Sequence, residues 1–192
     1  MEDKRIRKTK KMLKDTLISI LDEMPFEKVT VTMLCDRTDI SRITFYAHYA
    51  DKYDLVEDIF QDMIKIGTDD YALREKTNNA KGDIVTGFYN VLDSILELYY
   101  NQYHFFKHTE SNRNPYLSFS YYNHVFAIVE HHTNKESARH KLKYSTRQIT
   151  SFLCYGLLGF IDGSRSESVS AEQIKESAHR LLGDMLSKRI LF

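Results

Sequence analysis

The chain has 192 residues, of which 42% are hydrophobic and 28% are charged, and this is the composition of a globular protein. The 27 basic and 27 acidic residues cancel, so the overall charge gives no sign of a polyanionic partner. Only two prolines and seven glycines interrupt the chain, which favours long helices and disfavours a β-sandwich.

The two cysteines, Cys35 and Cys154, lie far apart and outside any CxxC pair. We therefore expect reduced thiols and neither a disulfide framework nor a zinc site. The N-terminus has no apolar signal core, and the most apolar run, 152–161, is shorter than the roughly 20 residues that span a bilayer. These features predict a cytoplasmic protein without a membrane partner.

Residues 1–14 form a basic arm, which contains seven lysines and arginines but only two acidic residues. Such an arm can contact phosphates or can be a solubilising, frayed terminus. Apolar side chains then recur at helical spacing from Ile6 to Met24, and Pro25 closes this first predicted helix.

Two short helices are predicted next, at 30–38 and 41–47, with residues 39–40 as a tight turn between them. Thr30 and Ser41 suit the N-cap of each helix. Isolated helices of this length are marginal, so their pairing between longer amphipathic helices predicts a helix-turn-helix. In that motif the second helix enters the major groove of DNA.

The predicted recognition helix has an outward face with Arg42, Thr44 and Tyr46, and we expect Ile43 and one edge of Phe45 to be buried. Arginine can bond bidentately to guanine, and threonine can bond to a base or contact a thymine methyl. Tyrosine, histidine and lysine near the helix would reach phosphates, which fix register. The predicted DNA contacts are Thr30, Ser41, Arg42, Thr44, Tyr46, His48 and Lys52.

The run 30–55 resembles the signature of the TetR family of transcriptional regulators. Residues 46–55 match its closing phrase YxxFxxKxxL, with Tyr49 in place of phenylalanine. Asp39 replaces the usual glycine of the turn, and aspartate tolerates the left-handed conformation better than most residues. The resemblance covers residues 5–60 and implies a homodimeric regulator that binds a palindromic operator.

Asp51 is expected to cap a connecting helix over 51–66. The polar, weakly periodic stretch 67–82 is expected to be a loop or a frayed helix end. We therefore predict a DNA-binding domain of residues 1–50 and a ligand-binding and dimerisation domain of residues 51–192.

The rest of the chain also has helical periodicity, so the predicted fold class is all-α: an N-terminal three-helix domain followed by a helical effector domain. Further helices are predicted over 83–108, 116–132, 137–162 and 171–191, with interruptions at 112–115, 133–136 and 163–170.

The resemblance implies dimerisation through the last two helices. The run 152–161 is apolar nearly all round, which is typical of a helix covered on more than one side. An intramolecular core is the alternative interpretation. The predicted interface residues are Phe152, Tyr155, Gly156, Gly159, Phe160, Leu181 and Met185.

Ten of the 24 aromatic residues lie between 99 and 126, and such a cluster can line an effector pocket or form core. His104 and His108 have chelating spacing but no nearby carboxylate or cysteine, so we predict no metal site and no cofactor. The candidate pocket residues are Tyr99, Tyr103, Phe106, Phe119 and Tyr122.

The sequence contains no glycine-rich phosphate loop, GxSxG or HExxH motif, so we do not expect an enzyme. The first hypothesis is a repressor that a small effector releases from DNA. The second is an activator that needs a protein partner, which a weaker resemblance of 152–174 to the subgroup of the dihydroxyacetone kinase operon activator implies. The third is a protein-interaction adaptor with a vestigial helix-turn-helix.

Overall fold

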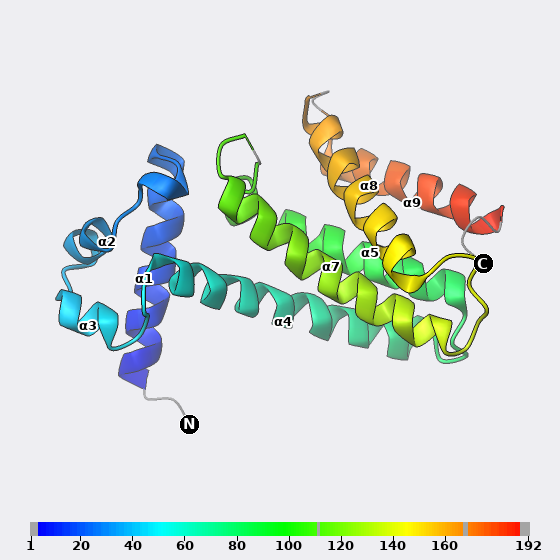
Figure 1. The fold of residues 1–192 in the computed structure, drawn as a ribbon, viewed down its shortest axis with the longest axis horizontal. Helices are drawn as coiled ribbons and strands as arrows, with labels where there is room; N and C mark the ends of the chain where they lie inside the picture. The colour runs from blue at the N-terminus through cyan, green and yellow to red at the C-terminus, as the bar shows by residue number, and fades with distance from the viewer. Residues whose placement is uncertain (1–3, 111, 167–168, 189–192) are drawn as a thin grey trace. The chain divides into compact units, whose positions relative to one another are not determined.

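The computed structural model describes residues 4–110, 112–166 and 169–188 and confirms the all-α class (Figure 1). No β-strand occurs among these residues. The helices are α1 (Lys4–Glu23), the 3-10 helix η1 (Phe26–Lys28), α2 (Val31–Thr38), α3 (Arg42–Tyr46), α4 (Lys52–Asn78), α5 (Ile84–Asn101), α6 (Tyr103–Phe106), α7 (Pro115–Ser137), α8 (Thr146–Ser166) and α9 (Ala171–Ser187).

The chain folds into two compact units. The first unit extends to Met63 and also contains Tyr103–Phe119, and the second contains Ile64–Gln102 and the chain from Ser120 onward. The division therefore lies inside α4, whereas the sequence predicted it at residue 50. The expected domains also omitted the return of residues 103–119 to the N-terminal unit.

The core of the first unit explains this return. Phe60 of α4 and Phe105 of α6 meet edge to face, with ring centroids 5.2 Å apart. Asn114 is fully buried, accepts a 2.7 Å hydrogen bond from the Phe26 main chain and donates a 2.8 Å bond to the His108 carbonyl. Because one amide satisfies two segments that are distant in sequence, it fixes the loop before α7 against η1.

The predicted loop or frayed helix end at 67–82 is wrong for most of its length, because α4 remains helical to Asn78 and only residues 79–82 are non-helical. Its second half lies in the second unit and is held largely by polar contacts. Asp70 accepts hydrogen bonds from Arg74 at 2.6 Å and from Ser94 of α5 at 2.8 Å. Sequence periodicity misses such a helix, because it detects apolar stripes and not polar ones.

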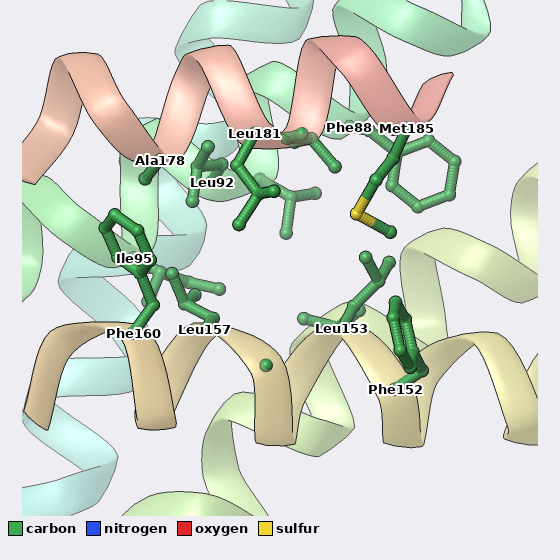
Figure 2. Close-up of a pocket in the computed structure, with 14 residues that line it drawn as sticks. Phe88, Leu92, Ile95, Phe152, Leu153, Leu157, Phe160, Ala178, Leu181 and Met185 are labelled. Carbon is green, nitrogen blue, oxygen red and sulfur yellow. The ribbon is translucent and has the colours of Figure 1, made fainter. Parts of the chain in front are cut away.

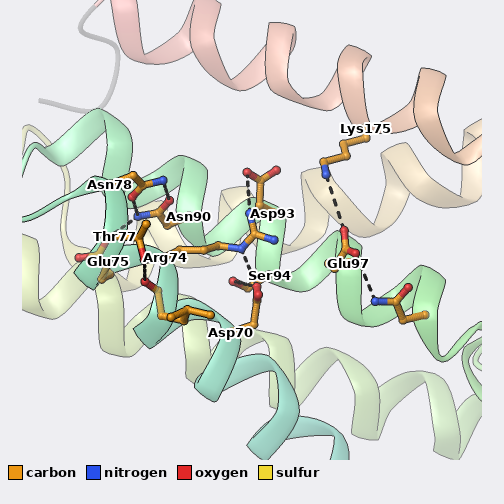
Figure 3. A network of polar contacts seen from close by, with 12 residues as sticks. Asp70, Arg74, Glu75, Thr77, Asn78, Asn90, Asp93, Ser94, Glu97 and Lys175 are labelled. Carbon is orange, nitrogen blue, oxygen red and sulfur yellow. Dashed lines mark hydrogen bonds and ion pairs between the residues drawn. The ribbon is translucent and has the colours of Figure 1, made fainter.

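A polar network joins α4, α5 and α9 of the second unit (Figure 3). Asn78 and Asn90 exchange two hydrogen bonds of 2.9 Å. Arg74 also reaches Asp93 at 3.4 Å, and Asp93 in turn meets His179 of α9. These contacts tie the last helix to the connecting helix through α5.

The predicted turn at 133–136 is also wrong, since α7 continues to Ser137. In this last turn, Thr133 is buried and donates a hydrogen bond to the Val129 carbonyl. Helix α8 begins only at Thr146, because Ser145 accepts a hydrogen bond from the Gln148 main chain at 3.2 Å as a cap. The predicted end of the last helix, at 189–191, lies outside the described residues.

Candidate nucleic-acid interface

Helices α2 and α3 are delimited by the predicted caps. The Thr30 hydroxyl accepts a hydrogen bond from the Met33 amide at 3.2 Å, and the Ser41 hydroxyl accepts one from the Thr44 amide at 3.1 Å. Asp39 has φ 53° and ψ 40°, which is the left-handed conformation expected of the turn. The predicted turn between the two helices is therefore confirmed.

Helix α3 is anchored by one core residue. Phe45 is fully buried, and its ring centroid lies 5.5 Å from that of Tyr46 and 5.9 Å from that of Tyr49. Ile43, which we expected to be buried, is instead 84% exposed. Residues two positions apart in a helix point about 200° away from each other. Burial of Phe45 therefore directs Ile43 outward.

The other predicted contacts of α3 lie on or near its surface. Arg42 is exposed, and its Nη2 donates a 2.7 Å hydrogen bond to the Thr32 hydroxyl of α2. The half-buried Thr44 lies 2.9 Å from the Ser41 hydroxyl, oxygen to oxygen. Tyr46 is 57% exposed and His48 is half-buried. The structure thus brings together most of the residues that the sequence proposed for DNA contact.

Lys52 differs from the expectation of a phosphate contact. Its ammonium donates hydrogen bonds to the carbonyls of Phe26 at 2.9 Å, Glu27 at 3.0 Å and Val29 at 2.9 Å. An ammonium has three protons, so none is left for a phosphate. Burial lowers the pKa of this lysine, although Glu27 and Asp51 oppose the shift. Lys52 therefore anchors η1 to the start of α4.

The N-terminus of α4 has the predicted aspartate cap. The Asp51 carboxylate accepts hydrogen bonds from the amides of Tyr53 at 2.8 Å and Asp54 at 2.9 Å. The Asp54 carboxylate accepts one from the Ala50 amide at 2.9 Å. The cap satisfies two of the free amides at this helix end and helps to fix the chain between α3 and α4.

The inner part of the basic arm is paired within the first unit. Lys14 lies 2.6 Å from the Asp62 carboxylate and 3.1 Å from that of Asp58, and Lys10 lies 3.6 Å from Asp58. Burial acts to raise the pKa of Asp58, but hydrogen bonds from Tyr49 and Lys14 outweigh it and hold the pKa below its usual value. Asp58 and Asp62 thus neutralise the inner part of the arm.

Arg37 is likewise paired: its Nη1 and Nη2 each donate a 2.5 Å hydrogen bond to one carboxylate oxygen of Glu23. This bidentate pair raises the pKa of the arginine through the hydrogen bond to Glu23. Exposed basic residues remain at the outer end of the arm, at Lys4, Arg7 and Lys8. The exposed cations of the first unit that could meet a nucleic acid thus include that end of the arm, Lys28 and Arg42.

The five proposed effector residues do not share one environment. Tyr99 and Phe106 are buried, whereas Tyr103 and Phe119 are 46% and 64% exposed. Tyr99 packs against Tyr100 with centroids 5.2 Å apart, as a core residue does. The half-buried Tyr122 lies 4.5 Å from Tyr155, centroid to centroid. Tyr99 and Tyr122 belong to the second unit and the other three to the first.

An apolar groove of about 200 Å³ lies in the second unit, mainly between α5, α8 and α9 (Figure 2). All of its lining residues are apolar or glycine: Phe88, Val91, Leu92, Ile95, Val129, Phe152, Leu153, Gly156, Leu157, Phe160, Ala178, Leu181, Leu182 and Met185. The sequence did not predict it, because it combines α5 with the consecutive helices α8 and α9, which follow much later in the chain.

Five of the seven residues predicted for the dimer interface line this groove: Phe152, Gly156, Phe160, Leu181 and Met185. The structure also leaves this face open. Phe152 is 60% exposed, the neighbouring Tyr155 66% and Leu181 49%. A Cβ atom added at Gly156 or Gly159 would meet no atom within 4 Å.

The predicted i, i+4 histidines do not share one helix face: His104 of α6 is exposed, and His108, which follows this helix, is buried 3.3 Å from the Asp22 carboxylate. Burial lowers the pKa of His108, although Asp22 opposes the shift. Over the part of the chain that the structure describes, no group of three or more candidate ligands could hold a metal ion. None of the described helices is long and apolar enough to cross a membrane.

Comparison with known proteins identifies the fold. No family model matches the chain, and no curated protein sequence is similar to it. A crystal structure from Syntrophomonas wolfei, of a protein provisionally named a TetR-family transcriptional regulator, superposes with a TM-score of 0.74 at 10% identity, over 94% of this chain and 95% of that one. The chain therefore has the fold of a TetR-family regulator.

A second solved structure, the dihydroxyacetone kinase operon activator DhaS, is 17% identical over 95% of this chain and 92% of its own, with a TM-score of 0.42. A score this low supports no conclusion about shared function.

Proposed function

We propose that the protein is a transcriptional regulator that binds double-stranded DNA through α3. The observation that supports this best is the exposure of α3. This five-residue helix buries only Phe45 and presents Arg42, Ile43 and Tyr46 to the surface. A short helix held by a turn and a neighbouring helix, with its outer face free, is the form that enters a major groove.

The distribution of charge supports binding by a few placed residues. The inner arm and Arg37 are neutralised within the fold, so few cations remain for phosphates. The DNA affinity should therefore decrease as the salt concentration rises, but only weakly. The slope of log affinity against log salt concentration is proportional to the number of phosphates that the protein neutralises. Because an α3 this short reads few base pairs, two copies on a palindrome supply the specificity.

Selection of bound duplexes from random DNA by the purified protein tests the proposal. We expect a palindrome with half-sites about one helical turn apart. Recovery of no preferred sequence, together with salt-independent retention of DNA, would support the adaptor hypothesis instead. Arg42→Ala should broaden the selected motif, and Tyr46→Ala should weaken binding to it. Lys141→Ala and Tyr144→Ala change exposed residues of the second unit and serve as matched controls.

We further propose that the α8 and α9 surface forms the homodimer interface. Phe152, Tyr155 and Leu181 are too exposed to be explained by the core of one chain, and two open glycines would let a partner helix approach closely. Tyr155→Glu should convert a dimer into a monomer in sedimentation experiments while the helical circular dichroism is retained. Tyr144→Glu is the control, because Tyr144 is also exposed.

We propose that an effector binds in the apolar groove and not in the aromatic cluster, so that effector and partner subunit would share residues such as Phe152 and Leu181. A wholly apolar lining suits a neutral, apolar molecule and offers no charged group to bind an ion. If the protein is a repressor, such a molecule would release it from DNA. If it is a partner-dependent activator, the molecule would leave DNA binding unchanged, and activation would require a second protein. Transcription from the selected operator, with and without the protein, distinguishes repression from activation. A DNA-binding role also favours the cytoplasm as the site of action.

A further inference from the structure

Ile43 is the most exposed large hydrophobic residue among those that the structure describes, at 84%. It lies in the second position of α3, on the side opposite the buried Phe45. A single exposed apolar residue is ordinary on a protein surface. Its position on the outward side of the proposed recognition helix is what distinguishes this one.

The polar neighbours of Ile43 are already engaged. The Arg42 guanidinium donates to the Thr32 hydroxyl at 2.7 Å, and the hydroxyls of Ser41 and Thr44 are hydrogen-bonded to each other at 2.9 Å. These bonds hold the polar side chains close to the fold. The isoleucine side chain, by contrast, is 84% exposed and projects from α3.

The chemistry around Ile43 favours DNA over a protein as the occupant of this surface. Its neighbours in the chain and across the turn are hydroxyls and a guanidinium, which suit phosphates and base edges. An apolar protein partner would instead require a continuous apolar patch. In the major groove, the apolar group that distinguishes one base from the others is the C5-methyl of thymine.

We propose, on the basis of the DNA-binding function above, that Ile43 reads the C5-methyl group of a thymine in each half-site. Contact between the branched side chain and this methyl removes both from water. Loss of one buried methyl corresponds to about a fourfold change in affinity. The operator half-site should accordingly contain one thymine that cannot be replaced by uracil without loss.

The test uses the full-length protein and the duplex selected from random DNA. Each thymine of a half-site is replaced in turn by deoxyuridine, which removes only the methyl group. The dissociation constants of wild type and Ile43→Ala are then measured on every duplex. Alanine is a strong helix former, and position 43 is exposed, so this variant should keep its fold. Ile66→Ala, at a position of α4 that is 48% exposed, is the matched control.

We expect one thymine position per half-site at which uracil weakens wild-type binding about fourfold. Ile43→Ala should bind the thymine duplex equally weakly and should show no further loss with uracil, and Ile66→Ala should behave as wild type. Equal losses with uracil in wild type and Ile43→Ala would overturn the inference. So would unchanged binding by Ile43→Ala, the result expected if Ile43 served a protein partner. Failure to select any motif would instead overturn the DNA-binding function itself.

Discussion

The Tyr49 hydroxyl donates a 2.7 Å hydrogen bond to the carboxylate of Asp58. Tyr49 occupies the position at which the TetR signature has phenylalanine, and its hydroxyl has a partner nearly two turns into α4. The same carboxylate lies 3.1 Å from the Lys14 ammonium of α1. Asp58 thereby joins α1, α4 and the segment that follows α3.

Tyr49→Phe should destabilise the first unit modestly. The variant loses one hydrogen bond to a charged group, and Asp58 keeps its two lysines, so we expect a decrease of about 1–2 kcal/mol in the free energy of unfolding. Urea denaturation of wild type and variant measures the change. Tyr53→Phe is the control, because Tyr53 is 42% exposed. An increase in stability on Tyr49→Phe would show that the hydroxyl is poorly accommodated.

Lys52→Ala should act on folding more than on DNA. The substitution removes the ammonium donor from the carbonyls of Phe26, Glu27 and Val29, and we expect a loss of about 1–3 kcal/mol in the free energy of unfolding. At temperatures where the variant is folded, the salt dependence of DNA affinity should equal that of wild type. Lys28→Ala, at an exposed position of η1, is the control. If Lys52→Ala reduced the salt dependence of DNA affinity but left the free energy of unfolding unchanged, Lys52 would contact a phosphate after all.

The elements set by local rules could be predicted from the sequence. The caps at Thr30, Ser41 and Asp51, and the turn at Asp39, each involve atoms within a few residues. Burial of Phe45 was expected only in part, and the exposure of Ile43 was missed. The helical period alone would have shown that both cannot face the core.

Features that depend on distant residues could not be predicted in this way. Asn114 bonds to Phe26, 88 positions away, and so places the loop before α7 in the first unit. Lys52 meets three carbonyls more than 20 positions earlier. No local pattern encodes these pairings, and a lysine beside a recognition helix resembles a phosphate ligand until its partners are known.

Gly87→Ala should be destabilising although alanine favours helices. A Cβ atom at this position of α5 would lie 2.8 Å from the Cε1 atom of His132, which is buried. Such overpacking costs about 1–3 kcal/mol, more than the roughly 1 kcal/mol gained in helix propensity. Gly163→Ala in α8, where a Cβ meets no atom within 4 Å, should be neutral or stabilising. The melting temperatures of both variants and of wild type are measured by thermal denaturation. Equal stabilisation by the two substitutions would contradict the close packing of Gly87 against His132.

His132 is the buried histidine of α7, and it should give the second unit a pH-dependent stability. It is 1% exposed, its Nδ1 lies 2.8 Å from the Tyr71 hydroxyl, and its ring meets that of Phe88 edge to face. Burial lowers its pKa from 6.5 to about 4, although Glu75 opposes the shift. The folded protein therefore holds this imidazole neutral under conditions in which the unfolded chain protonates it.

The sign of the effect follows from proton binding. Between pH 6.5 and about 4 the unfolded chain binds one more proton at this site than the folded chain, so stability decreases as the pH falls through that window. The slope from one group approaches about 1.4 kcal/mol per pH unit. Above pH 6.5 both states are neutral at this site, and its contribution to the pH dependence ends.

His132→Gln should therefore flatten the dependence of the unfolding free energy on pH between about 6.5 and 4, whatever its effect on stability at neutral pH. Glutamine can still bond to the Tyr71 hydroxyl but does not titrate. His131→Gln removes the neighbouring exposed histidine and serves as the matched control. Denaturant unfolding of the three proteins across this range measures the slopes. Identical slopes in wild type and His132→Gln would mean that the buried imidazole is protonated in the folded protein, against the burial described.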